Sequence, residues 1–462
     1  MYQTMNSETI CAVSTAPGVG GIAVVRVSGP DAVEICDRIW HGKPLEGVES
    51  HTAHLGTIVD PERPDEPLDT AVATVFRAPR SFTGEDVVEI SVHGSVWIQR
   101  ELVNLLIRSG CRVAQAGEFT RRAFTNGRLD LAQAEAVADV IAASSRSSHR
   151  LAASQMRGDF SKRIGELRDK LIEIASLLEL ELDFSEEDVE FASRIHLREL
   201  AETLHDRIST LAASFSTGSA LKDGVPVAIV GEPNAGKSTL LNQLLHDNRA
   251  IVSDIPGTTR DTIEDTMEID GVLYRFIDTA GIRDTTDSVE NLGIERSYAA
   301  IGRARIVVWL VTPDTPAGRY EEMRAAILSH LTEGTELITV INKIDLLETT
   351  PATGFGHDGE SIGISAATGE NIPRLLEALH RLSGVGLTEG ADLIVTNARH
   401  YEALVNARDS ISRVISGLDS NLSGDFIAQD LRETIHHLST ITGTITTDTL
   451  LQTIFSRFCI GK

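Results

Sequence analysis

The sequence reads Gly231-Glu232-Pro233-Asn234-Ala235-Gly236-Lys237-Ser238 between a short apolar run, Val225–Val230, and a segment with helical spacing. A strand, a glycine-rich loop and a helix in this order are typical of a phosphate-binding loop. In such a loop the amides surround the phosphates, Lys237 reaches the β- and γ-phosphates, and the Ser238 hydroxyl binds Mg²⁺. A chance glycine-rich turn would rarely occur in this context, so the sequence predicts a nucleotide site.

Three further short motifs follow in the order and spacing of a guanine-nucleotide domain. Asp278-Thr279-Ala280-Gly281 comes directly after an apolar run, so its Asp can support Mg²⁺ and its Gly amide can meet the γ-phosphate. Asn342-Lys343-Ile344-Asp345 also follows an apolar run. The Asp345 carboxylate can accept two hydrogen bonds from guanine that adenine does not offer, and Ser365-Ala366 would close over the base. Together the motifs predict selectivity for GTP over ATP.

The motif Gly257-Thr258-Thr259-Arg260-Asp261 lies between the first two, where a switch segment belongs. We expect the Thr259 hydroxyl to complete the Mg²⁺ shell, while Pro256-Gly257 also fits an ordinary turn. Ras-like hydrolases place Gln directly after the Asp-Thr-Ala-Gly run, where it orients the attacking water. That position is Ile282, which cannot do so. Either hydrolysis is very slow, or the polar group comes from elsewhere.

The nucleotide-binding domain is predicted as an insertion between two helical stretches of one domain. Insertion is tolerated where the two ends of a domain lie close together. We expect a mixed α/β domain over residues 1–118, a helical domain over 119–218 and 386–462, and a GTPase domain over 219–385. Alternating strands and helices in the insertion predict a mostly parallel sheet covered on both faces.

The expected elements follow from local periodicity and from breaker residues. Strands are expected at Gly21–Val27, Ala71–Phe76, Val87–Val92, Val225–Val230, Tyr274–Ile277, Ile306–Val311 and Leu337–Ile341. Helices are expected at Ala32–Trp40, Val96–Ser109, Leu129–Ile141 and Ile164–Leu182, with helical texture continuing to about Ser216 and again over Val395–Phe458. The proline-rich, acidic stretch Asp60–Leu68 is expected to be an exposed loop.

The composition limits the partners and the compartment. The 462 residues carry a formal net charge of −25, which argues against broad, nonspecific nucleic-acid binding, so any RNA contact must be local. No apolar run is long enough to span a membrane, and the polar start of the chain lacks the pattern of a signal peptide. Four scattered cysteines, Cys11, Cys36, Cys111 and Cys459, fit a cytoplasmic protein without structural disulfides or zinc.

At this point the chain resembles a known family, the tRNA-modification GTPases called MnmE or TrmE, over essentially its whole length. Two stretches resemble the family's GTPase domain, Asn234–Ser238 and Gly257–Asp261. The more specific stretches are Gly20-Gly21-Ile22, Arg26–Gly29, Ser81–Asp86, Gly117–Phe124, Asn126–Ala136 and the final Cys459-Ile460-Gly461-Lys462.

The resemblance implies a modification of the tRNA wobble uridine at C5 with a carboxymethylaminomethyl or aminomethyl group. The implied partner is the FAD-dependent flavoprotein MnmG, in a heterotetramer with a homodimer of this chain. The N-terminal domain would form the dimer and bind a 5-formyl- or methylene-tetrahydrofolate. The GTPase domains would pair across the dimer with K⁺ in the site, and this pairing would trigger hydrolysis.

The resemblance also assigns site residues by matching position. Folate would be bound by Arg26, Glu85, Arg128 and Lys462, although the family often has Lys at position 128. K⁺ would be bound by Asn234, Ser253, Ile255 and Thr258, while the Mg²⁺ ligands remain Ser238 and Thr259, as the nucleotide motifs predict. Glu290 matches the family's water-orienting acid, whereas without that match it would be taken for a solvated helix residue.

The complete nucleotide site expected from the motifs and the resemblance takes in separate stretches of chain. There are five of these stretches, and their members are Asn234, Ala235, Gly236, Lys237, Ser238, Thr239, Ser253, Asp254, Ile255, Pro256, Gly257, Thr258, Thr259, Asp278, Thr279, Ala280, Gly281, Asn342, Lys343, Asp345, Ser365 and Ala366.

Two other interpretations remain open at this stage. The GTPase motifs alone also fit a ribosome-assembly or signalling switch that recruits partners and modifies nothing. The N-terminal domain could also be a dimerisation module without a folate site. Cys459 fits either a reactive thiol or an ordinary tail residue.

Overall fold

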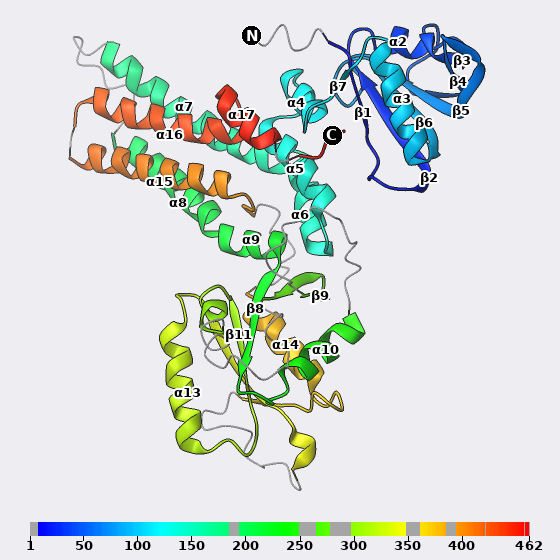
Figure 1. Cartoon of the computed structure of the whole chain (residues 1–462). Coiled ribbons are helices and arrows are strands. Elements are labelled where there is room, and N and C mark those ends of the chain that lie inside the picture. The colour runs from blue at the N-terminus through cyan, green and yellow to red at the C-terminus, as the bar shows by residue number, and fades with distance from the viewer. Residues whose placement is uncertain are drawn as a thin grey trace. The chain divides into compact units, whose positions relative to one another are not determined.

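The computed structural model describes residues 8–183, 194–248, 265–277, 297–347, 361–384, 394–420, 422–456 and 458–461. The chain divides into two compact units, which we describe separately (Figure 1). The first unit is Met1–Ala138, Gln155–Ala192 and Leu422–Lys462, and the second is Asp139–Ser154 and Ser193–Asn421. The helical stretches contribute to both units, and the domain boundaries expected at 118, 218 and 385 stay predictions.

The first unit contains a seven-stranded sheet in the order β3-β4-β5-β6-β2-β1-β7. Its strands are β1 Ile10–Val13, β2 Gly20–Ser28, β3 Trp40–Gly42, β4 Thr52–Asp60, β5 Arg63–Phe76, β6 Val87–Gly94 and β7 Arg112–Val113. Neighbouring strands are antiparallel except β1 and β7, which are parallel. Helices α2 (Ala32–Arg38) and α3 (Val96–Arg108) belong to the same domain.

One face of this sheet is buried and the other is partly open. In β2, Val25 and Val27 belong to the hydrophobic core, while Val24 and Arg26, which alternate with them, are only half-buried. Side chains alternate between faces along a strand, and antiparallel sheets commonly bury only one face. The alternation therefore places Arg26 on the open face.

The expected loop at Asp60–Leu68 is wrong, because this stretch is the end of a β-hairpin. Strand β4 ends at Asp60 and β5 begins at Arg63, with Asp60 opposite Arg63 and Val59 opposite Pro67. The register shifts twice at this end, and such irregular, exposed pairing tolerates proline, which cannot donate to a regular ladder. The helix expected to reach Trp40 ends at Arg38, because Trp40 begins β3.

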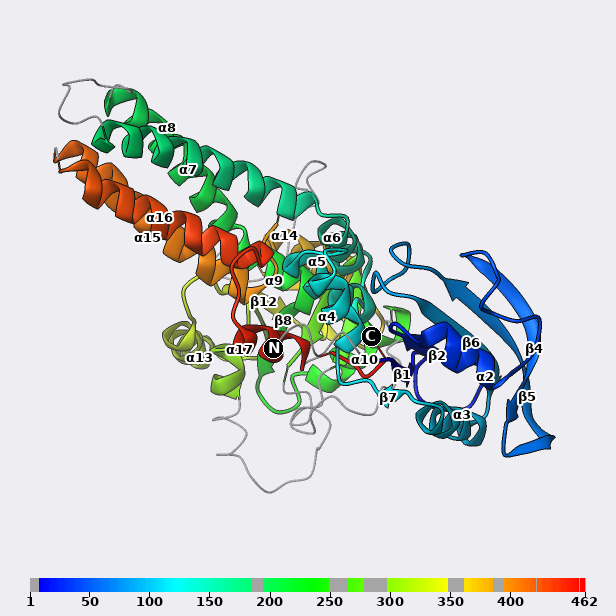
Figure 2. The same cartoon turned by 90° about the horizontal axis from the view of Figure 1, so that it is seen from above.

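The helices of the first unit include a long antiparallel pair. Its members α7 (Asp159–Asp183) and α16 (Gly424–Thr442) pack side by side, as Figures 1 and 2 both show. The shorter helices are α4 Glu118–Thr125, α5 Leu131–Ala142 and α17 Asp448–Phe455, whereas α6 (Arg146–Met156) belongs to the second unit as far as Ser154. Leu131 of α5 packs with Leu451 and Phe455 of α17. The expected helical texture is confirmed here.

The second unit contains a six-stranded sheet in the order β13-β12-β11-β8-β10-β9. Its strands are β8 Val225–Gly231, β9 Asp265–Ile269, β10 Val272–Phe276, β11 Ile306–Val311, β12 Glu336–Ile341 and β13 Ile362–Gly363. All pairs are parallel except β9 with β10, which confirms the mostly parallel sheet. Its helices are α8 Arg194–Ala213, α9 Phe215–Asp223, α10 Lys237–Asn248, α13 Ala317–His330, α14 Ile372–Leu382 and α15 Ala398–Asp419.

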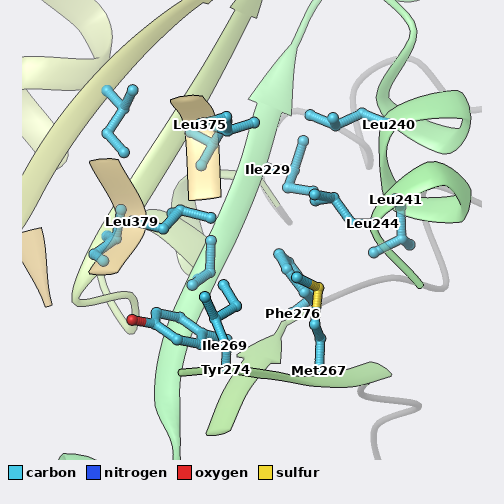
Figure 3. Packing of buried hydrophobic residues seen from close by; sticks show 14 of the residues in the cluster. Ile229, Leu240, Leu241, Leu244, Met267, Ile269, Tyr274, Phe276, Leu375 and Leu379 are labelled. Atoms are coloured by element: carbon cyan, nitrogen blue, oxygen red, sulfur yellow. The ribbon is translucent and has the colours of Figure 1, made fainter. Parts of the chain in front are cut away.

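This sheet is buried on both faces, as a parallel sheet requires. Along β11, Val308 and Leu310 belong to one hydrophobic cluster, and Val307 and Trp309 belong to another. Figure 3 shows the first cluster, in which leucines of α10 and α14 surround Ile229 of β8. The two cores fix the ends of β8, β11 and β12, and two of the predicted nucleotide motifs directly follow β8 and β12. No helix within the described ranges is long and apolar enough to cross a membrane.

Candidate functional site

The phosphate loop lies between the end of β8 and the start of α10, as predicted. Gly231 has φ 152° and Gly236 has φ 99°, a region that favours glycine. A Cβ on Gly231 would meet the Leu310 carbonyl of the next strand, and one on Gly236 would meet the Asn342 amide. Asn234 also has a left-handed backbone, with φ 66°, and asparagine tolerates this better than most residues. The two glycines therefore allow the loop to pass close to its neighbours.

Lys237 is folded back onto the loop that it terminates. Its Nζ donates to the carbonyl oxygens of Gly231, at 2.8 Å, and Glu232, at 2.9 Å. Burial lowers the pKa of Lys237, and the negative charge of Glu232 acts in the opposite direction. The ammonium group is thus held within the loop, at the N-terminus of α10, where a phosphate would also be favoured by the helix amides.

Asn342 joins the phosphate loop to the predicted base-binding segment. Its Nδ2 donates to the Ala235 carbonyl oxygen at 2.8 Å, and its Oδ1 accepts from the Ala366 amide at 2.9 Å. The Asn342 residue is only 2 % exposed, so both bonds are shielded from water. Motifs 107 residues apart in the chain therefore lie in direct contact.

A cavity of about 200 Å³ opens beside these motifs, lined by the loop, the end of β11 and Lys343. Its polar lining includes Glu232, Asn234, Thr312, Asp314 and Lys343. Nearby, Asp345 lies exposed on a single 3₁₀ turn, Ile344–Leu346, and Ser365 is fully buried. Ser238 and Thr239 follow Lys237 in the first turn of α10. The described part of the predicted nucleotide site is thus assembled at one edge of the sheet.

Several predicted residues lie outside the described residues, and their roles stay predictions. They are Ser253, Asp254, Ile255, Pro256, Gly257, Thr258, Thr259, Asp278, Thr279, Ala280, Gly281, Glu290 and Lys462. Among the residues that are described, no group of three or more His, Cys, Asp or Glu side chains could hold a metal ion.

The first unit brings the three described folate candidates into one region of its sheet. Arg26 on β2 forms an ion pair with Glu89 on β6, its cross-strand neighbour, with Nη2 and Oε1 2.8 Å apart. The Arg26 guanidinium also lies 5.2 Å from the ring centre of Phe82 and 5.6 Å from that of Phe119, within the range of cation–π attraction. Arg26 is therefore fixed in position from three sides.

Glu85 is held by two different kinds of donor. The Ser28 hydroxyl donates to Oε2 at 2.7 Å, and Arg122 Nη1 lies 3.1 Å from the same oxygen. Arg122 is itself 2 % exposed and also bonds Glu118 at 3.1 Å. A buried arginine between two carboxylates keeps the Glu85 side chain in one place, because a buried charge without partners would be costly.

Arg128 and the end of the chain approach the same domain. The stem of Arg128 lies over Gly84, so that a Cβ on Gly84 would meet Arg128 Cγ at 3.1 Å. At the chain's end, the Gly461 carbonyl oxygen accepts from the Ser14 hydroxyl at 3.0 Å, just beyond β1. Ile460 forms a bridge with Ala116. The terminal segment preceding Lys462 therefore lies against the N-terminal sheet.

Two protein families and several known proteins match this chain over nearly its whole length. Residues 9–128 match the family described as GTP-binding protein TrmE N-terminus, and residues 131–459 match the MnmE helical domain. The tRNA modification GTPase MnmE of Parabacteroides distasonis is 54 % identical over 463 residues, covering 98 % of this chain and 100 % of the relative. That of Bacteroides fragilis is 51 % identical over 470 residues, covering 99 % and 100 %.

The chain belongs to the MnmE family of tRNA modification GTPases. Membership excludes the signalling or ribosome-assembly switch as the main interpretation, because the likeness extends through both helical stretches and the N-terminal domain. The resemblance stated from the sequence motifs is confirmed.

Sequence reasoning missed three charged residues that the structure places at these sites in this MnmE-family chain. Arg122 lies inside the family motif Gly117–Phe124, but the sequence of that motif does not reveal that Arg122 contacts Glu85. Glu89 has a weak signal, since it follows the Ser81–Asp86 motif on a strand that pairs with β2. Arg319 carries no signal at all, and it bonds the phosphate loop through Glu232.

The hairpin formed by β9 and β10 lies between two of the nucleotide motifs in the chain, and its turn is bonded to helix α6. Strand β9 follows the Gly257–Asp261 motif in the chain, and β10 ends just before Asp278. Its turn uses two left-handed residues, Asp270 with φ 49° and Gly271 with φ 83°, which suit a tight hairpin. The Gly271 carbonyl oxygen accepts from the Ser147 amide of α6 at 3.0 Å. Within the second unit, α6 is thus bonded to the hairpin that separates the Gly257–Asp261 motif from the Asp278–Gly281 motif.

Proposed function

We propose that this protein hydrolyses GTP to drive addition of a carboxymethylaminomethyl or aminomethyl group at C5 of the tRNA wobble uridine. It acts in the cytoplasm, as a homodimer and in a heterotetramer with the FAD-dependent protein MnmG. The observation that carries the proposal is identity of 54 % over the full length of a tRNA modification GTPase. The phosphate loop and the Asn342 segment, which share one cavity, support the GTPase part of it.

The nucleotide would be held by residues whose chemistry fits each part of it. Amides at the start of α10 and the Lys237 ammonium suit the phosphates. The Ser238 hydroxyl and that of Thr259 are oxygen donors of the kind Mg²⁺ prefers, and bound Mg²⁺ would neutralise phosphate charge. The exposed Asp345 carboxylate would accept from guanine.

A potassium ion and an acid would complete the hydrolytic machinery. Asn234, at an exposed bend of the loop, would supply one oxygen to K⁺, together with Ser253, Ile255 and Thr258. A cation there would neutralise charge that develops between the β- and γ-phosphates. Glu290 would orient the attacking water, a role that Ile282 cannot fill.

The N-terminal domain would bind a reduced folate, either 5-formyl- or methylene-tetrahydrofolate. Glu85 suits the N–H donors of a pterin, because a carboxylate with two bound donors still has free lone pairs. The cations Arg26 and Arg128 suit the carboxylates of the folate glutamate. Lys462 would follow Gly461 to the same domain.

Mass spectrometry of wobble uridines tests the modification. In cells that lack this protein, the modified nucleoside should disappear, and a plasmid-borne copy should restore it. A plasmid-borne Lys237→Ala copy should not restore it, because the phosphate contact is lost. Unchanged nucleosides in the deletion strain would overturn the modification part of the proposal.

Calorimetry with 5-formyltetrahydrofolate tests the folate site and separates it from a pure dimerisation module. Deleting Ile460–Lys462 should weaken folate binding and leave GTP affinity unchanged. Glu85→Gln should also weaken it, whereas Glu34→Gln, on the exposed side of α2, serves as a matched control. An intact protein that dimerises but binds no folate would refute the pocket and favour the dimerisation module.

A further inference from the structure

The phosphate loop of this chain carries a carboxylate of its own, at Glu232. Its Oε1 accepts from Arg319 Nε at 2.9 Å, and Arg319 comes from the first turn of α13. The side chains are 38 % and 51 % exposed, so neither is locked in the core. Arg319 also bonds Glu322, one turn further along the same helix, at 2.9 Å.

The position of Glu232 matters because of what would bind beside it. Its carbonyl oxygen is bonded by Lys237 Nζ, the group expected to meet the phosphates, and its carboxylate acts electrostatically on Lys237. A nucleoside triphosphate brings several negative charges to this loop, in a chain whose net charge is already −25. An uncompensated carboxylate here would oppose nucleotide binding.

We propose that Arg319 is a specificity-determining residue, which cancels the charge of Glu232 and so sets the affinity for GTP relative to GDP. GTP carries more negative charge than GDP, so an unpaired Glu232 carboxylate would repel GTP more strongly. Pairing of Glu232 with Arg319 therefore favours GTP over GDP. Two unit charges about 10 Å apart in water change an equilibrium constant roughly twofold, and salt screens the effect over about the same distance.

A structural role would give a different pattern from a charge role. If the ion pair only fixed the shape of the loop, losing either partner would break the same contact, and both variants would bind nucleotide more weakly. If the pair acts through charge, losing the carboxylate and losing the arginine have opposite effects. The two variants therefore separate the explanations by sign.

The experiment titrates the full-length protein with GDP and with a non-hydrolysable GTP analogue at low salt. Glu232→Gln should bind the triphosphate about two- to fourfold more tightly, and Arg319→Gln about two- to fourfold more weakly, with smaller effects for GDP because it carries less charge. The double variant should return close to wild type, and high salt should remove the differences. Glu322→Gln is the matched control, since Glu322 shares Arg319 but lies outside the loop.

Three outcomes would overturn the inference: weakening by both single variants, differences that persist in high salt, or no change in either variant. Melting temperatures of all variants identify any that fail to fold, and Glu232→Gln alone still tests the sign if Arg319→Gln does not fold. The inference rests on GTP binding by this loop. Failure of the wild type to bind either nucleotide would refute the proposed function, whereas normal wild-type binding with the wrong pattern would refute only the role of Arg319.

Discussion

Replacing Asn342 with alanine should separate the phosphate loop from the base-binding segment. The side chain makes two buried hydrogen bonds, one to the Ala235 carbonyl oxygen at 2.8 Å and one from the Ala366 amide at 2.9 Å. Alanine has no side-chain amide, so the Ala235 carbonyl oxygen and the Ala366 amide would each lose their hydrogen-bond partner while buried. Nothing else in the site is expected to change directly, because Lys237 is held by other atoms.

The size of the effect follows from the two orphaned groups. Each buried polar group left unsatisfied costs about 1–3 kcal/mol. GTP binding requires both segments in place, so part of this cost lowers the affinity for GTP. A share of about 2–4 kcal/mol corresponds to a roughly 30- to 1000-fold loss of GTP affinity. The remainder would lower the stability of the second unit.

Isothermal calorimetry with GTP and GDP measures this loss, and thermal unfolding measures the accompanying stability. Asn126→Ala is the matched control, because Asn126 also donates its amide to a backbone carbonyl, that of Thr83, at 2.7 Å in the first unit. It should leave GTP affinity unchanged. A folded Asn342→Ala protein that binds GTP within about threefold of wild type would contradict the argument that these bonds hold the site together.

Four further changes have expected outcomes. Asp345→Asn should weaken GTP binding and shift preference toward xanthosine triphosphate in competition assays; unchanged preference would contradict the base contact. K⁺ should accelerate hydrolysis where Na⁺ does not, and equal turnover at matched ionic strength would refute the role of Asn234. Glu290→Ala should lower kcat by roughly 10²–10⁴-fold with GTP binding near normal, and single-turnover rates equal to wild type would leave Glu290 a bystander. Burial alone would raise the pKa of Glu118, but bonds from Arg112 and the Gln115 amide hold that pKa below its ordinary value. A carboxyl group with a depressed pKa stabilises the fold above its unfolded pKa, and this is lost as pH falls through the folded pKa. Glu118→Gln should therefore lower the melting temperature at pH 7, and this loss should shrink as the pH is lowered below the unfolded pKa of a glutamate; a loss that does not change with pH would refute the linkage.

The nucleotide fold was predictable because its motifs are local. The loop Gly231–Ser238 is constrained within eight residues, and the uninterrupted apolar run Ile306–Val311, typical of a strand buried on both faces, is visible in the sequence. What could not be predicted is how distant segments meet. The Asn342–Ala235 bond and the Arg319–Glu232 pair depend on which strand ends lie together, and only the sheet order β12-β11-β8 decides that.

The amino-acid composition gave a wrong prediction at the end of the β4–β5 hairpin, where strand pairing decides the structure. Prolines and acids at Asp60–Leu68 indicate a loop, yet the irregular end of a hairpin accepts them because its ladder is already interrupted. Very short strands such as β7 and β13 carry too few residues for a period of two to show. In the N-terminal domain, the family resemblance predicts Arg26 and Glu85 as site residues, but finding their partners Glu89 and Arg122 required the register of β2 against β6 and the packing of α4.

The two candidate sites handle the same electrostatic problem with opposite degrees of burial. At Glu85 the compensating Arg122 is 2 % exposed and shared with Glu118, so removing it would leave Glu85 without its charged partner, take one bond from the buried Glu118 and damage the fold. At Glu232 the compensating Arg319 is half exposed, and exposed ion pairs contribute little to stability. A change at Arg319 can therefore alter the charge beside the phosphates without a large effect on folding. In a chain with a net charge of −25, this makes the exposed pair the one through which nucleotide affinity can be adjusted, and the buried pair the one that fixes geometry.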